Sequence, residues 1–332
     1  MNAFGLLGAL AVGAAFGYGA QRGAFCMNSG FRGATEGDWT KIKALGLAVA
    51  VQLLLLPAIF ATGLARPVEL PLPFLGAVVG GLLFGASMRW AGGCAAGVWY
   101  KLGAGDVGAL LAILGMALGA TAADSGPLLG IRASLQEAIP STASWSPPLV
   151  VSVGAGLLLL AALARRADGR AGAWSWRKTG LWVGVVATLA WPVSAGAGRD
   201  FGLAVVPGTT GLLSSIAGHP FPAWDGLLVL GILLGGWLGA RRNGPVALSA
   251  PNSAALLKRF AGGFGLGTGA SIAAGCTVGQ GLTGLALLAP SSFVVMGAIF
   301  GGASMATLVA RRLETAPVPG SRLPLPPEET RQ

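Results

Sequence analysis

The chain of 332 residues has a mean hydropathy of +0.71, and only 10% of its residues are charged. An ordinary soluble domain has roughly 25% charged residues, so this composition excludes a typical soluble protein. The net charge of +10 does not indicate a nucleic-acid partner, because the basic residues form short clusters between long apolar runs. This pattern is typical of an integral membrane protein, whose surroundings are the lipid bilayer.

Apolar runs long enough to cross a bilayer recur along the whole chain. A helix needs about 20 apolar residues to span a hydrocarbon core of ~30 Å. In chain order, the runs predict nine transmembrane helices near residues 2–20, 44–65, 70–88, 105–123, 148–164, 179–197, 225–240, 253–272 and 292–310.

The distribution of charge predicts the orientation of these helices. With the N-terminus periplasmic and the C-terminus cytoplasmic, 19 of the 22 Lys and Arg residues fall on the cytoplasmic side. Only Arg66, Arg132 and Arg199 fall outside. Because cytoplasmic loops are enriched in Lys and Arg, we predict this orientation rather than its reverse.

Four apolar stretches between the predicted crossings are too short or too rich in glycine to span. They comprise residues 23–33, 91–102, 201–217 and 275–289. Irregular backbone is tolerated at membrane depth only where protein buries it or where it lines a cavity. We therefore predict four re-entrant half-helices that point into the protein.

Two segments of the chain are visibly related. Gly80–Gly97 reads GGLLFGASMRWAGGCAAG, and Gly262–Gly279 reads GGFGLGTGASIAAGCTVG, at a constant offset of 182 residues. The predicted topology gives the two copies opposite orientations, as in transporters with inverted repeats and a binding site near the midplane.

The expected fold is an all-α polytopic membrane protein with about nine transmembrane helices and four half-helices in two inverted repeats. The expected divisions are residues 1–147 for the first repeat, 148–178 for a linking helix and cytoplasmic loop, and 179–313 for the second repeat. The Pro-rich, polar residues 314–332 are expected to form a disordered cytoplasmic tail.

The three cysteines of the chain all lie in the predicted half-helices. Cys26, Cys94 and Cys276 form no CxxC pair, so no local redox or zinc motif is present. The start of a half-helix offers free N–H groups and a positive dipole end, and a thiol adds a weak S–H donor. We predict a substrate path for a large, soft anion at these thiols and at Gly93 and Gly275, which precede two of them.

Gln280 follows Cys276 closely, and its amide could donate hydrogen bonds to an oxyanion. It is therefore included among the predicted substrate-binding residues. No nucleotide-binding, haem or hydrolase motif is present in the sequence, and neither a cofactor nor enzymatic activity is expected.

The sequence resembles the YeeE/YedE family of sulfur-transport membrane proteins over roughly residues 3–312. The resemblance rests on the two Gly-Cys half-helices, on Cys26 within RGAFCMNSGFR, and on GRDFG at Gly198–Gly202. It implies import of thiosulfate, or of a close sulfur or selenium oxyanion, across a bacterial inner membrane. Three thiols would pass the anion along: Cys276 toward the outside, Cys94 at the centre and Cys26 toward the cytoplasm.

The resemblance also implies a partner, since such transporters often work beside a small cytosolic sulfur-carrier protein. Two other functions remain open at this point. One is a membrane enzyme that exchanges disulfides or persulfides through Cys94 and another thiol. The other is a transporter that binds soft metal ions through thiolates. The single histidine and the lack of Met clusters argue against it.

Overall fold

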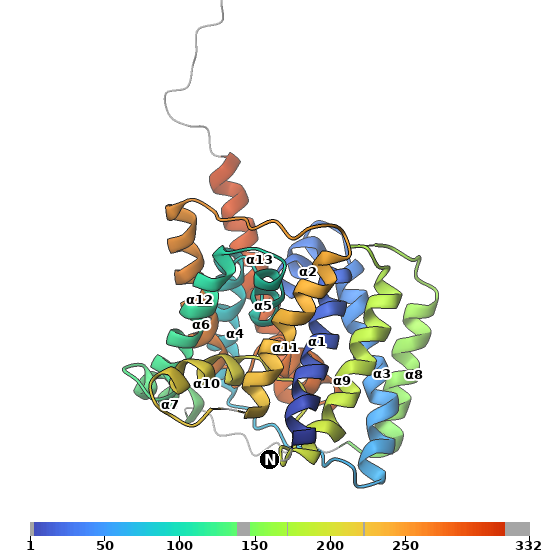
Figure 1. Ribbon diagram of the computed structural model, residues 1–332. Coiled ribbons are helices and arrows are strands. Elements are labelled where there is room, and N and C mark those ends of the chain that lie inside the picture. Colours follow the sequence, from blue (N-terminus) through green and yellow to red (C-terminus); the bar gives the residue numbers. More distant parts are fainter. Residues whose placement is uncertain (1–2, 138–146, 171, 222, 316–332) are drawn as a thin grey trace, which may run out of the picture.

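The structure is a computed structural model (Figure 1) and describes residues 3–137, 147–170, 172–221 and 223–315. Within these residues the chain is helical and has no β-strand, as predicted for the fold class. The predicted disordered tail lies almost wholly outside the described residues. Its first two positions, 314 and 315, instead continue the last helix, which ends at Thr315.

Nine longer helices and five short ones make up the described residues. The longer ones are α1 (Ala3–Arg22), α3 (Thr40–Ala61), α4 (Phe74–Ala91), α6 (Gly108–Asp124), α8 (Leu149–Ala164), α9 (Trp176–Gly196), α11 (Ala223–Arg241), α12 (Ser253–Ile272) and α13 (Pro290–Thr315). The short ones are α2 (Met27–Ala34), α5 (Ala95–Gly103), α7 (Leu129–Glu137), α10 (Val206–Ile216) and the π-helical turn η1 (Gly279–Gly284).

Length and composition alone identify fewer membrane crossings than the sequence predicts. Among the described residues, five helices are long and apolar enough to cross, and six if the pair α6 and α7, bent by 66°, forms one span. Helix α8 has only 16 residues. The all-helical membrane architecture is therefore confirmed, whereas nine crossings with four re-entrant half-helices stay a prediction.

Glycine contacts between α4 and α12 follow a reciprocal pattern. A Cβ atom built on Gly80 would lie 2.5 Å from the nitrogen of Ala273, and one on Gly262 would lie 2.2 Å from the nitrogen of Ala91. Since Gly262 and Ala273 stand 182 residues after Gly80 and Ala91, exchanging the two segments reproduces the contact. The two copies run antiparallel here, and such self-complementary contacts are the geometry that a two-fold axis produces.

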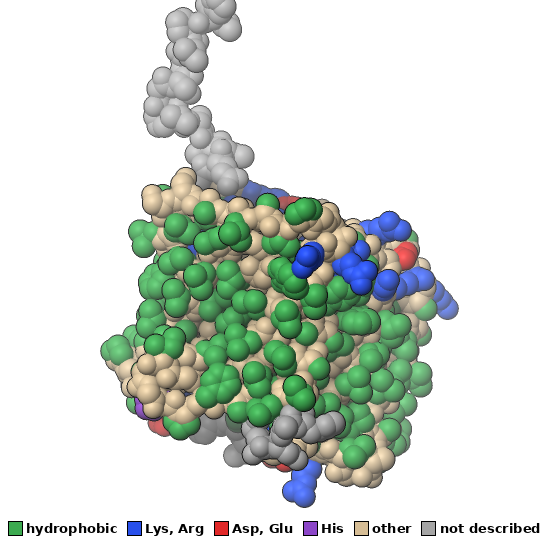
Figure 2. Space-filling view, in the orientation of Figure 1, with side chains coloured by type: hydrophobic (Ala, Val, Ile, Leu, Met, Phe, Trp, Pro, Cys, Tyr) green, Lys and Arg blue, Asp and Glu red, His purple; other side chains and the backbone are tan. Residues whose placement is uncertain are grey.

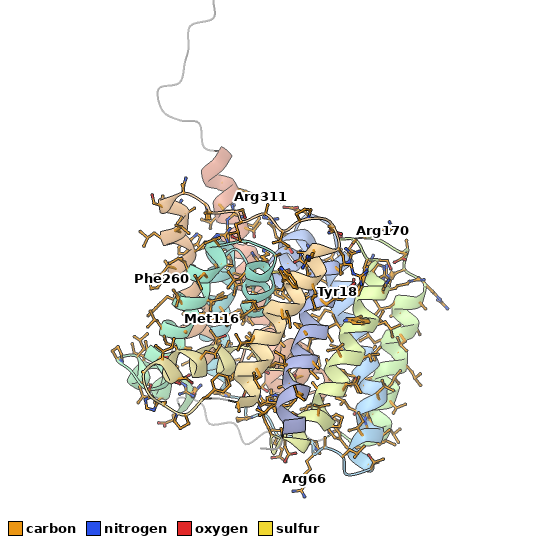
Figure 3. The ribbon with its side chains drawn as sticks, viewed as in Figure 1. Tyr18, Arg66, Met116, Arg170, Phe260 and Arg311 are labelled. Atoms are coloured by element: carbon orange, nitrogen blue, oxygen red, sulfur yellow. The ribbon has the colours of Figure 1, made fainter. Side chains whose placement is uncertain are left out.

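The surface has two chemically distinct ends. In Figure 2, hydrophobic side chains cover the sides of the visible face, and Lys and Arg gather near one end. Figure 3 shows Arg170 and Arg311 at this end, here called the basic end, and Arg66 at the opposite one, here called the Arg66 end. The N-terminus of α1 lies near the Arg66 end, and α13 leaves the bundle at the basic end (Figure 1).

Candidate functional site

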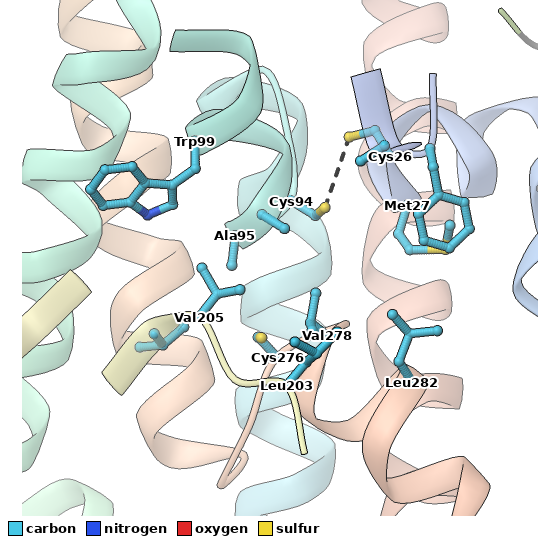
Figure 4. Packing of buried hydrophobic residues seen from close by; sticks show 14 of the residues in the cluster. Cys26, Met27, Cys94, Ala95, Trp99, Leu203, Val205, Cys276, Val278 and Leu282 are labelled. Carbon is cyan, nitrogen blue, oxygen red and sulfur yellow. Dashed lines mark hydrogen bonds between the residues drawn. The ribbon is translucent and has the colours of Figure 1, made fainter. Parts of the chain in front are cut away.

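The three cysteines lie in one buried cluster in the interior of the bundle. Cys26, Cys94 and Cys276 are only 2–3% exposed and belong to the same hydrophobic core. Figure 4 shows their sulfur atoms following one another in the order Cys26, Cys94, Cys276. The structure thus brings together residues that are up to 250 positions apart in the sequence (276 minus 26).

Each thiol is placed by the start of a short helix or turn. Cys26 is the N-cap residue of α2, and Cys94 is the N-cap residue of α5. The first N–H groups of a helix have no partner within the helix, so they are free to interact with other groups. The backbone N–H groups of Met27 and Gly97 interact with the Cys94 sulfur, and that of Asn28 interacts with the Cys26 sulfur.

Two of the thiols are in direct contact. The Cys26 thiol donates a hydrogen bond to the Cys94 sulfur, with 3.9 Å between the two sulfur atoms (Figure 4). Gly97 allows this approach, because a Cβ atom built on it would lie 2.7 Å from the Cys26 sulfur and 3.3 Å from that of Cys94. In the first copy of the GCxxG motif, the last glycine therefore makes room for both sulfurs, whereas a Cβ atom on Gly279 in the second copy would meet no atom within 4 Å.

The third thiol lies at a separate cavity. Cys276 and Gly279 line a cavity of about 460 Å³, together with residues of α6, α7, α10 and α12 that include Arg132. Helices α7 and α10 lie near the Arg66 end, so the cavity adjoins this end (Figure 1). The backbone N–H groups of Val205, Val278 and Gly279 interact with the Cys276 sulfur. A molecule in the cavity would meet this thiol before the other two.

Two buried valines lie between the third thiol and the thiol pair. In Figure 4, Val205 and Val278 lie between the Cys276 and Cys94 sulfurs, and they are 0% and 4% exposed. Val205 directly precedes α10, as Cys26 directly precedes α2. Three of the four predicted half-helix stretches carry a cysteine, and the stretch that contains α10 has the apolar Val205 at the corresponding place.

Gln280 holds the backbone that carries Cys276. Its Nε2 donates to the carbonyl of Ala274 over 2.8 Å, and its Oε1 accepts a hydrogen bond of 2.6 Å from the Ser292 hydroxyl. Gly275 has φ +151°, and a Cβ atom on it would lie 2.8 Å from the Gln280 side chain. Gly275 therefore gives Gln280 space to reach Ala274. Gln280 also lines the cavity, and its predicted role in substrate binding stays a prediction.

Gly93 has a local packing contact in the structure. A Cβ atom on it would lie 3.1 Å from the nitrogen of Val98, on the first turn of the half-helix that Cys94 begins. The predicted role of Gly93 in substrate binding stays a prediction.

Several polar residues near the thiols did not emerge from the sequence. Gln52 is completely buried on α3 and donates to the carbonyl of Leu282 in η1 over 3.2 Å. Gln52 could have been noticed in the sequence as a single amide within a long apolar run, because polar residues inside a membrane segment are rare. Lys41 and Lys101 contact the segments that carry Cys26 and Cys94, and only the folded chain reveals these contacts.

This arrangement suits a soft, polarisable anion that is held weakly at each of several positions. Thiols and backbone N–H groups donate hydrogen bonds without adding charge, so each of these contacts holds the anion weakly. Among the described residues, no group of three or more His, Cys, Asp or Glu side chains could hold a metal ion.

An all-helical bundle with apolar sides is the architecture of a multi-pass membrane protein. A family model described as sulphur transport matches residues 22–305, and the chain belongs to this family. This confirms the resemblance seen in the sequence.

Two characterised relatives agree with this assignment. The thiosulfate transporter TsuA of Spirochaeta thermophila is 32% identical over 328 residues, which cover 91% of this chain and 98% of the relative. The thiosulfate transporter TsuA of Escherichia coli is 32% identical over 315 residues, which cover 85% and 88% of the two chains. Both are named as transporters, in agreement with the expectation that this chain is not an enzyme.

Proposed function

We propose that the protein imports thiosulfate, or a close sulfur or selenium oxyanion, by a relay of weak contacts with three thiols. The anion would enter the cavity at the Arg66 end, meet Cys276, pass Val205 and Val278, and reach the Cys94 and Cys26 pair. The observation that carries the proposal is the line of buried thiols, each among backbone N–H groups, that starts at this cavity. The names of the two relatives support thiosulfate as the substrate.

The proposal includes a direction across a bacterial inner membrane. The basic end would face the cytoplasm and the Arg66 end the periplasm, because cytoplasmic loops concentrate Lys and Arg. The N-terminus would then be periplasmic and the C-terminus cytoplasmic. A small sulfur-carrier protein that accepts the imported sulfur would dock at the basic end.

The two halves of the path would come from inverted repeats at residues 1–147 and 179–313, joined by residues 148–178. The reciprocal contacts of Gly80 with Ala273 and of Gly262 with Ala91 support this division. Helix α8 packs against α3 and would lie outside the repeats.

Uptake of ³⁵S-thiosulfate into proteoliposomes tests the proposal. Cys26→Ala, Cys94→Ala and Cys276→Ala should each reduce uptake to near background, because each removes one S–H donor from the line. Met305→Ala is a suitable control, since Met305 lies exposed on α13. Sulfate and selenite as competitors define the substrate. Full uptake by the triple Cys→Ala variant would overturn the relay.

A second function has one specific observation in its favour. The two sulfurs of Cys26 and Cys94 are close enough for a thiol-exchange enzyme. Mass spectrometry of the purified protein after exposure to thiosulfate separates the two functions. A stable persulfide on either cysteine favours the enzyme, and unmodified thiols favour the relay.

A further inference from the structure

Two lysines near the basic end are tied to the segments that carry the thiol pair. Lys41, in the first turn of α3, donates a hydrogen bond of 2.6 Å from Nζ to the Ser29 hydroxyl. That hydroxyl donates in turn to the carbonyl of Cys26 over 3.1 Å. Lys101, in the last turn of α5, donates to the carbonyl of Gly92, two residues before Cys94.

Both ammonium groups retain unused hydrogen-bond capacity. An ammonium group has three donors, and one of them is engaged on each lysine. Within residues 3–137, 147–170, 172–221 and 223–315, no carboxylate forms an ion pair with Lys41 or Lys101. Both side chains are partly buried, and their charges interact with one another and with Cys26, while the charge of Lys41 also interacts with the Asp38 carboxylate. Asp38 forms no ion pair with Lys41, so two partly desolvated positive charges are still able to attract an anion.

The segment around Cys276 is held in a different way. Its support comes from Gln280 and Ser292, which are both neutral. Among the described residues, Lys41 and Lys101 place positive charge on the basic-end side of the thiol pair, whereas Arg132 at the Cys276 cavity forms an ion pair with Asp124. An anion that leaves Cys276 would gain electrostatic stabilisation as it approaches Lys41 and Lys101.

We propose that Lys41 and Lys101 form an anion-receiving site next to Cys26, on the cytoplasmic side of the thiol pair. The inference rests on the proposed function, since its ligand is the transported sulfur oxyanion. Because the lysines are only partly buried, water screens their charges and the anion is released rather than trapped. The site would attract the anion past Val205 and Val278 and release it into the cytoplasm.

Uptake by lysine variants separates this role from simple structural support. Lys41→Met and Lys101→Met should each reduce thiosulfate uptake by about tenfold or more, as expected for a lost contact between charged groups. Lys41→Arg and Lys101→Arg keep the charge and should retain much of the uptake. Ser29→Ala removes the hydrogen bond of Lys41 but leaves its charge, so it should transport far better than Lys41→Met. Equal defects in Ser29→Ala and Lys41→Met, or normal uptake in both Met variants, would overturn the proposal.

Protection of the lysines from an amine-acylating reagent tests binding without transport. In purified protein at constant ionic strength, thiosulfate should slow acylation of Lys41 and Lys101 relative to chloride, as measured by peptide mass spectrometry. Lys258 on α12 is the internal control and should react equally in both salts. Protection without uptake by the wild type would contradict the proposed function but support the site. Normal uptake without protection would contradict the site alone.

Discussion

The thiols of Cys26 and Cys94 are held face to face in the interior of the bundle, with 3.9 Å between their sulfurs. A disulfide between them would shorten this distance to about 2.05 Å. Cys276 lies on the other side of Val205 and Val278 (Figure 4). At the scale of single residues, the site therefore consists of one pair of thiols in contact and one separate thiol.

Mild oxidation should join Cys26 to Cys94 and leave Cys276 free. With copper phenanthroline as oxidant, each thiol gives up its proton, and the pair gives up two electrons as the S–S bond forms. Peptide mapping should find this disulfide, and uptake should fall because two S–H donors are lost. In Cys94→Ala, no disulfide should form. A bridge from Cys276 to either of the other cysteines would contradict the described arrangement.

Gly97→Ala should impair transport more than it impairs folding. The added methyl group would meet both sulfurs of the pair, at 2.7 Å from Cys26 and 3.3 Å from Cys94. Gly46→Ala is the matched control on α3, because its methyl group would make only ordinary contacts, the nearest at 3.6 Å. We expect uptake to fall several-fold in Gly97→Ala and to stay near wild type in Gly46→Ala. Equal uptake by the two variants would show that the sulfurs can move aside freely.

The sequence identified the three cysteines but not their pairing. Cys94 and Cys276 stand out because the repeat places them at equivalent positions, and Cys26 stands out because it lies in another predicted half-helix. The contact between Cys26 and Cys94 spans 68 residues and depends on how two helix starts meet in space. No local motif encodes such a distance, and the same is true of the contacts made by Lys41 and Lys101.

At the scale of elements, the short helices place the thiols, and neutral hydrogen bonds hold the irregular segment around Cys276. Ala274 has φ +52°, a conformation that costs free energy for a residue with a Cβ atom. The bond from Gln280 to the carbonyl of Ala274 stabilises this turn. The turn and the amide therefore act together to fix the position of the third thiol.

Removing this support should weaken both stability and transport. Gln280→Ala leaves the Ala274 carbonyl and the Ser292 hydroxyl without this partner, at a cost of about 1–3 kcal/mol for each group left unsatisfied. Ser292→Ala removes only one of the two bonds, so its effect should be smaller. Thermal unfolding in detergent and thiosulfate uptake should both follow the order wild type, Ser292→Ala, Gln280→Ala. An unchanged unfolding temperature in Gln280→Ala would contradict this role.

Most breaks between helices could be predicted from glycine and from short apolar runs. Each of the four predicted half-helix stretches contains a short helix or turn, namely α2, α5, α10 and η1. Their re-entry into a membrane stays a prediction. Neither α7 (Leu129–Glu137) nor the π-helical geometry of η1 was predicted from the sequence. Both depend on packing and on hydrogen bonds with distant segments, such as that of Gln136 with Ser271.

At the scale of the whole molecule, glycines set the distance between the longer helices. A Cβ atom on Gly267 of α12 would lie 2.0 Å from the carbonyl oxygen of Met116 on α6. Between membrane helices such close approach replaces the hydrophobic effect, because lipid is as apolar as the side chains. The bundle therefore depends on small residues at many interfaces.

A single methyl group at such an interface should destabilise the bundle. Gly267→Ala forces α6 and α12 apart, whereas Gly297→Ala on α13 meets no atom within 4 Å. We expect Gly267→Ala to unfold at a lower temperature and to yield less monodisperse protein in detergent, with Gly297→Ala close to wild type. Equal stability of the two variants would mean that the helices separate at little cost.

The position of Val205 and Val278 in the proposed path has a consequence for the proton gradient across the membrane. These buried side chains offer water no hydrogen bond, so in the proposed path they would disfavour a continuous file of water between Cys276 and the thiol pair. Protons would leak along such a file. A path without one would let the oxyanion cross while the gradient is kept, with contacts to the protein replacing the water that the anion leaves behind.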